Sequence, residues 1–222
     1  CSMATAPNER VSGAQPADQN RFWQSAAARF RASSTRRGIT QLVTTLPPLA
    51  LLFVAMYQSL GVSWWLTLGL APLTGAFLLR AFIIMHDCGH GSFLPSRRAN
   101  EIIGFCTGVL TLTPFAQWRR DHALHHASSG DLDRRGHGDI HTLTVKEYLA
   151  KDARGRFTYR VFRNPFILFG LGPIYLMFSQ RWRPESRATK AMQLNSVRDT
   201  NIAVLGLAIL FTFLIGWRAL LL

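Results

Sequence analysis

The chain has 222 residues, of which 48% are hydrophobic and 17% charged, a balance too apolar for an ordinary soluble domain of this size. Its 25 Lys and Arg residues against 12 Asp and Glu give a formal net charge of +13, and the charges stand in blocks between apolar runs. Such blocks indicate contact with anionic lipid headgroups, because a nucleic-acid-binding surface would interleave basic and aromatic residues on one polar face. The composition therefore predicts a membrane protein with no nucleic-acid partner.

The first segment, residues 1–38, is rich in small and polar residues and has no apolar core of the kind a signal peptide requires. We expect a largely disordered cytoplasmic leader, in which residues 22–32 (FWQSAAARFRA) predict a short amphipathic helix. The chain starts at Cys1 and stops inside an apolar run at Leu222, which predicts a fragment of a longer protein. The chain has three cysteines, Cys1, Cys88 and Cys106. They show no paired spacing and indicate neither a disulfide framework nor a thiolate metal site.

Two long apolar runs follow the leader. Residues 39–60 carry no charge and residues 64–85 carry only Arg80, so each run approaches the length of a membrane-spanning helix. Pro47 and Pro48 are expected to kink the first helix. Arginines precede the first run and the connecting turn is uncharged, so the positive-inside rule places the leader and the end of the second helix in the cytoplasm.

Three further apolar runs complete the predicted domain, residues 39–222. Residues 102–118 contain Gly104, Gly108 and Pro114 and have arginines on both sides, which predicts a segment that enters or lies on the membrane without crossing it. Residues 165–179 are short and precede a basic loop, so the same interpretation applies. Residues 201–222 predict a third span. The expected fold is all-α, a multi-pass transmembrane protein with a cytoplasmic histidine-rich helical cap.

All seven histidines fall between positions 86 and 141. His86 and His90 stand four residues apart, so their rings lie about 40° apart around a helix. His122, His125 and His126 have the spacing i, i+3 and i+4, which confines them to an arc of about 100°. Two converging helices would present five imidazoles to one volume, and we predict a metal site there.

The number of imidazoles favours two metal ions. A single catalytic zinc ion usually takes three protein ligands, whereas a two-metal centre with open positions accommodates five, and iron in that setting activates oxygen. Asp87 lies about 100° around the helix from His86, which predicts a hydrogen-bond acceptor for a ligand rather than a ligand. His137 and His141 lie among glycines and predict a polar loop.

The two histidine motifs resemble those of a known protein family. HDCGHGSF (residues 86–93) followed by WRRDHALHH (residues 118–126) resembles the first and second histidine boxes of the membrane fatty acid desaturases. The continuation HHASSGDLDR (residues 125–134) is similar to the acyl-lipid, delta-12/omega-6-like members, which act on already unsaturated chains. The resemblance covers essentially residues 39–222 and includes the spacing of the boxes and the two preceding spans.

The resemblance implies a non-haem di-iron oxidoreductase with two iron ions. Such an enzyme uses O2 and two electrons from a ferredoxin or cytochrome b5-type donor to introduce a cis double bond into the acyl chain of a membrane lipid. The implied location is a membrane, the bacterial inner membrane, with the histidine boxes on the cytoplasmic side. The family carries a third histidine box after its last membrane helix, and this chain has no such sequence, so we expect residues 1–222 alone to lack ligands and to be inactive.

Three aromatic residues beside the boxes, Phe93, Phe115 and Trp118, are candidates to line an acyl passage, but aromatics near apolar runs more commonly sit at the membrane interface. We therefore predict the interfacial position for them.

Other functions remain open on the sequence alone. A membrane di-iron hydroxylase or carotenoid ketolase would use the same ligands and retain oxygen in the product. An intramembrane zinc metalloprotease would explain HDCGH, which differs from HExxH only by Asp for Glu, but would leave HALHH without a role. A haem-binding electron carrier would use histidines as axial ligands, for which the adjacent His125 and His126 are redundant.

Overall fold

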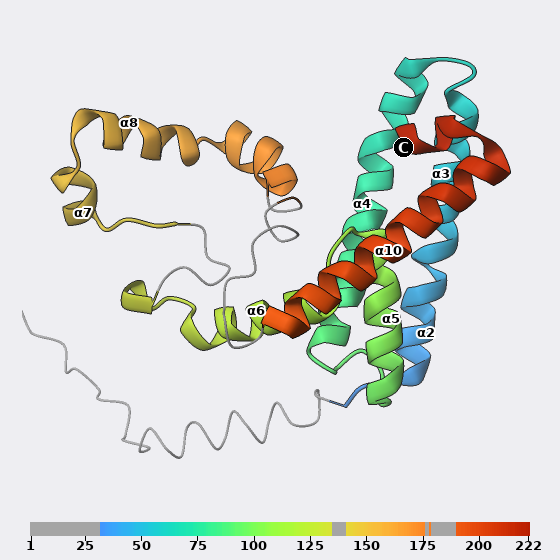
Figure 1. The fold of residues 1–222 in the computed structure, drawn as a ribbon, viewed down its shortest axis with the longest axis horizontal. Coiled ribbons are helices and arrows are strands. Elements are labelled where there is room, and N and C mark those ends of the chain that lie inside the picture. Colours follow the sequence, from blue (N-terminus) through green and yellow to red (C-terminus); the bar gives the residue numbers. More distant parts are fainter. Residues whose placement is uncertain (1–31, 135–140, 176–177, 179–189) are drawn as a thin grey trace, which may run out of the picture.

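The computed structural model describes residues 32–134, 141–175, 178 and 190–222, and all regular structure within these ranges is helical. Three helical segments are long and apolar enough to cross a membrane: Thr35–Ser59, Trp64–Gly89 and Ala191–Ile215. They form the bundle on one side of Figure 1. The predicted all-helical, multi-pass fold is confirmed. Three predicted features lie outside the described residues. They are the leader up to residue 31, which includes most of the predicted amphipathic helix, then His137, and then the basic loop ahead of the last span.

The first span is two helices, α2 (Thr35–Val43) and α3 (Leu46–Ser59), separated by a turn at residues 44–45. Pro47 and Pro48 fall in the first turn of α3, where a missing backbone N–H costs no helical hydrogen bond. The predicted kink is thus a break just before the prolines. The next span, α4 (Trp64–Gly89), starts at Ser63, whose hydroxyl accepts from the backbone N–H of Trp65.

The predicted non-crossing segment at residues 102–118 is a hairpin of two helices, α5 (Arg97–Leu110) and α6 (Phe115–Ser128). Neither is among the helices long enough to cross a membrane. A Cβ atom on Gly104 would overlap the ring of Phe115, so the missing side chain is what lets that ring pack on α5. Phe115 is 5% exposed and fixes the start of α6 against the bundle.

The third predicted span exists but begins earlier than expected. Helix α10 (Lys190–Ile215) begins eleven residues before the predicted start at 201, and it ends where Gly216 takes a positive φ of 93°. The polar early residues are buried: Gln193 and Thr200 are each 1% exposed, and Ser196 accepts a hydrogen bond from the backbone N–H of Gln117 in α6 at 3.3 Å. Their polarity suggests a loop, whereas they form the face that packs against neighbouring helices.

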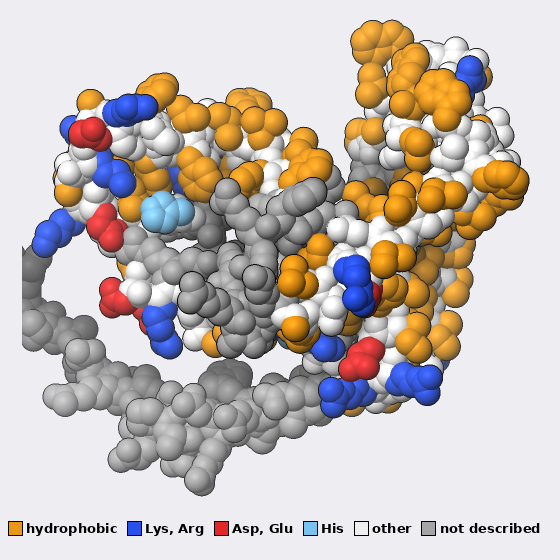
Figure 2. All heavy atoms as spheres, viewed as in Figure 1, with side chains coloured by type: hydrophobic (Ala, Val, Ile, Leu, Met, Phe, Trp, Pro, Cys, Tyr) orange, Lys and Arg blue, Asp and Glu red, His pale blue; other side chains and the backbone are white. Residues whose placement is uncertain are grey.

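The two ends of the bundle differ. One end carries the starts of α2 and α5, and it is where Lys and Arg side chains gather in Figure 2. The other end carries the turn between α3 and α4, where the hydroxyl of Tyr57 donates to the carbonyl of Ile215 at the end of α10. Hydrophobic side chains cover much of the visible bundle surface between them, as expected for helices that face lipid.

A separate group of short helices follows α6: η1 (Leu132–Arg134), α7 (Val145–Ala150), α8 (Ala153–Phe162) and η2 (Ile167–Leu171). Thr144 and Glu147 form a reciprocal capping box at the start of α7, and Asp152 caps α8. The described part of the apolar run at 165–179 is helical, and whether this run crosses the membrane stays a prediction.

The most buried apolar cluster lies at the end of α4. The side chain of Asn100 closes the loop after α4, because it accepts from the backbone N–H of Leu94 at 2.9 Å and donates to the carbonyl of the same residue at 2.8 Å. The cluster comprises Ile84, Met85, Cys88, Phe93, Leu94 and Phe115. This packing holds the end of α4, the following loop and the start of α6 in one rigid unit.

Candidate metal centre

Two histidines stand at the end of α4. His86 lies in the last turn and His90 is the residue that caps the helix, with its backbone N–H bonded to the carbonyl of His86 at 3.1 Å. The spacing of four residues directs both rings to one side, as the sequence predicts. The helix end is rigid because Met85 and Cys88, on the opposite side, are fully buried in the core.

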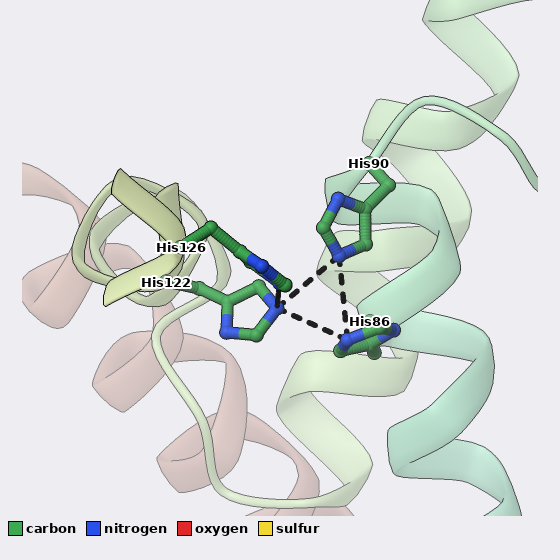
Figure 3. Close-up of side chains that lie close together, drawn as sticks. All are labelled: His86, His90, His122 and His126. Atoms are coloured by element: carbon green, nitrogen blue, oxygen red, sulfur yellow. Dashed lines mark hydrogen bonds between the residues drawn. The ribbon is translucent and has the colours of Figure 1, made fainter. Parts of the chain in front are cut away.

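Helix α6 supplies the second pair. His122 and His126 also stand four residues apart, and α6 brings both rings toward those of α4 (Figure 3). The start of α6 is anchored by Phe115 on α5, and its next turn contacts α4 through Trp118, which lies against Gly89. The helices therefore place two i, i+4 histidine pairs opposite one another.

The four Nε2 atoms form a compact group, here called the four-nitrogen cluster. The Nε2 atom of His122 lies 3.0 Å from that of His86, 3.2 Å from that of His90 and 3.0 Å from that of His126, and those of His86 and His90 are 3.3 Å apart. In the plane of the nitrogens of His86, His90 and His122, the point equidistant from all three lies about 1.8 Å from each, close to the roughly 2 Å of an imidazole–metal bond.

Asp87 orients one of these ligands. Its Oδ1 atom lies 3.0 Å from Nδ1 of His86. A carboxylate there holds a proton on Nδ1 and leaves Nε2 of His86 with a free lone pair that faces the cluster. This is the acceptor role that the sequence predicts for Asp87. The same hydrogen bond engages the Asp87 carboxylate, which the zinc protease alternative would need as a free general base.

The environment favours the neutral form of two of the rings, those of His122 and His90. Burial, followed by the charges of the neighbouring His86, His126, His90 and His125 rings, lowers the pKa of His122 to about 4. Burial, followed by the charges of His86 and His126, also lowers the pKa of His90. A neutral imidazole is the form that binds a metal ion, so His122 and His90 are prepared for metal at neutral pH.

The remaining predicted histidines lie elsewhere. The ring of His125 is 6.0 Å from that of His122 and 5.8 Å from that of His126, centre to centre, and it is not part of the four-nitrogen cluster. Its position as a ligand stays a prediction. His141 is exposed and its ring lies 6.5 Å from that of Tyr159, which lies in α8, away from the cluster. His137 falls outside the described residues.

Two of the three aromatic residues beside the boxes, Phe93 and Phe115, lie in the protein core rather than at the predicted interface, and the interfacial position of Trp118 stays a prediction. Phe93 and Phe115 are 6% and 5% exposed and belong to the core below the histidines, because the loop after α4 folds back over α5. Trp118 is half-buried and stacks on the ring of His122, with centres 4.4 Å apart and planes 17° apart. Sequence reasoning missed this contact, although a tryptophan four residues before a histidine in a helix is a usable signal.

The donor set fits a transition-metal ion. Four imidazole nitrogens converge, one is oriented by a carboxylate, and two of the rings, those of His90 and His126, are exposed enough to leave coordination positions accessible. The chemistry of the ligands suits iron, zinc and copper alike. A membrane-type helical bundle with such a cluster at the end of its second span has the features of an integral membrane protein with a metal-binding site.

Comparison with known proteins gives the family. The sequence model described as fatty acid desaturase matches residues 63–222, and this chain belongs to the fatty acid desaturase family. A fatty acid desaturase of Bacillus subtilis is 44% identical over 195 residues, which cover 88% of this chain and 55% of that relative. An sn-1 oleoyl-lipid 12-desaturase of Synechocystis is 30% identical over 140 residues, 63% of this chain and 36% of that protein.

A third relative, an sn-1 acyl-lipid omega-3 desaturase (ferredoxin) of Nostoc, is 28% identical over 157 residues, 67% of this chain and 42% of its own length. The chain therefore spans about half, or less, of the length of these curated relatives. No solved structure matches it significantly.

Proposed function

We propose that this chain forms part of a membrane-bound non-haem di-iron desaturase that introduces a cis double bond into a fatty acyl chain. The observation that carries the proposal is the four-nitrogen cluster in a member of the fatty acid desaturase family. We assign His86, His90, His122 and His126 as metal ligands. We also propose His125, one turn of α6 from His122, as a ligand for the second of two iron ions.

Iron bound there would supply, with O2 and two electrons, the oxidising power to remove two hydrogens from an unactivated methylene pair. The residues of this chain supply the geometry. Asp87 holds the proton on Nδ1 of His86 so that Nε2 faces the cluster. The low pKa of His122 keeps that ring unprotonated at neutral pH. The core below the cluster fixes α4 relative to α6 and excludes water from that side.

The relatives support a lipid substrate and a ferredoxin-type electron donor. One of them is named for an sn-1 oleoyl-lipid and another for an sn-1 acyl-lipid, and the second name includes ferredoxin. We propose an acyl chain of a membrane lipid as the substrate and a small redox protein, a ferredoxin or a cytochrome b5-type protein, as the donor. A bacterial inner membrane with the four-nitrogen cluster on the cytoplasmic side agrees with the arginines at that end of the bundle.

The test is a fatty acid profile. The gene that encodes this chain, expressed whole in a host that makes only monounsaturated lipids, is expected to produce a diunsaturated fatty acid. Replacement of His122 by Ala should abolish that product at equal protein level, whereas replacement of the exposed His141 by Ala should not. A hydroxylated product would favour the hydroxylase alternative, and an unchanged lipid profile with iron-loaded protein would contradict desaturation.

A further inference from the structure

Trp118 is wedged between the two histidine-bearing helices. On its own helix it stacks on the ring of His122, with 4.4 Å between centres and 17° between planes. Across the interface its ring centre lies 5.6 Å from that of His86, and it meets Phe82 of α4 edge to face at 5.5 Å. One indole therefore contacts a proposed ligand from α4 and one from α6.

The indole of Trp118 fits against α4 because the residue it contacts there, Gly89, has no side chain. A Cβ atom on Gly89 would be 2.9 Å from Cζ3 of Trp118, closer than packed carbon atoms normally approach, and in ordinary contact with Cε3 at 3.7 Å. The indole has little freedom to retreat, since Phe82 borders it on one side and His122 covers its face. Gly89 thus stands between the two ligands of α4 and sets how closely α6 approaches.

We propose that Trp118, seated against Gly89, is a positioning residue for the metal centre. This inference rests on the proposed metal site. The stacked indole fixes the ring plane of His122, so that its Nε2 atom points at those of His86 and His90. An imidazole that donates to a metal cation becomes electron-poor, and an electron-rich indole face stabilises it, so the contact favours the metal-bound state over the free state.

The experiment is a Co²⁺ titration of the purified full chain in detergent, followed by visible absorption and tryptophan emission. Trp118→Leu and Gly89→Ala are each expected to weaken Co²⁺ binding roughly tenfold, within the range found for groups that orient metal ligands. Trp118→Phe, which retains an aromatic face, should lose less affinity. Co²⁺ should quench part of the wild-type tryptophan emission, and that part should be absent in Trp118→Phe.

Matched controls separate positioning from general stability. Gly75→Ala changes another glycine of α4, where a Cβ would meet nothing within 4 Å, and Trp65→Phe changes a tryptophan that is 83% exposed at the other end of α4. Both controls should bind Co²⁺ as the wild type does, and Trp65→Phe should keep the quenching. Circular dichroism monitors folding, and the small changes Gly89→Ala and Trp118→Phe suffice if Trp118→Leu does not fold.

Wild-type affinity and spectra in Trp118→Leu and Gly89→Ala would overturn the positioning role and leave the metal site standing. A wild-type chain that binds no Co²⁺ would overturn the metal site and the inference together.

Discussion

The contact between Asp87 and His86 gives a sharp prediction. The two side chains are 38% and 30% exposed, and their atoms are 3.0 Å apart. Asp87→Asn keeps an oxygen that can accept from Nδ1 but removes the negative charge, whereas Asp87→Ala removes both. Groups that orient metal ligands contribute about 10- to 100-fold to metal affinity. Because solvent screens this half-exposed pair, we expect the lower end of that range, about tenfold for Asp87→Asn, and a larger loss for Asp87→Ala.

The assay is competition for Zn²⁺ between the detergent-solubilised protein and a chromophoric chelator at pH 7.5. Asp199→Asn is the matched control, since Asp199 is exposed and pairs with the adjacent Arg198 on α10. It should leave the affinity unchanged. An Asp87→Ala protein that competes as well as the wild type would refute the idea that the carboxylate orients His86.

The remaining predictions concern packing, pH and metal removal. Gly104→Ala should lower the free energy of unfolding by about 1–3 kcal/mol, because the added Cβ would overlap the ring of Phe115. Gly69→Ala is the control and should leave the free energy of unfolding unchanged, since a Cβ there would meet no atom within 4 Å. Thermal unfolding followed by circular dichroism measures both variants. The metal-free protein should lose stability as the pH falls from about 6.5 toward 4, since the unfolded chain then binds a proton at His122 that the folded chain does not. His122→Gln should weaken this dependence, and equal pH curves for the two proteins would contradict the cause. Adding Zn²⁺ should raise the melting temperature of the wild type and chelation should reverse the gain, while a variant with all four cluster histidines replaced should respond to neither.

The spans and the pairing of His86 with His90 could be predicted because they depend on local spacing and composition alone. The exclusion of His125 from the four-nitrogen cluster could not be predicted from the sequence. Three residues along a helix rotate a side chain about 60° from His122, whereas four rotate it about 40°, and the facing pair on α4 also uses a spacing of four. Which spacing meets the partner helix depends on how the helices pack, and that is a tertiary property.

Packing also explains the other differences between the sequence-based predictions and the structure. The start of α10 is polar in sequence, but Gln193 and Thr200 are buried against neighbouring helices, so composition placed the helix start too late. Phe115 lies in the core because Gly104 leaves room for its ring, a contact between residues eleven positions apart on different helices. Hydropathy describes the preference of each segment for water or lipid and does not describe which segments meet.

The most direct test of the central claim is X-ray absorption at the iron edge of the purified protein loaded anaerobically with iron(II). The structure predicts imidazole nitrogen ligands at roughly 2 Å, with the multiple scattering typical of histidine rings, and loss of that signal when His86, His90, His122 and His126 are replaced by Ala. An unchanged iron spectrum in the variant that lacks all four histidines would contradict the account.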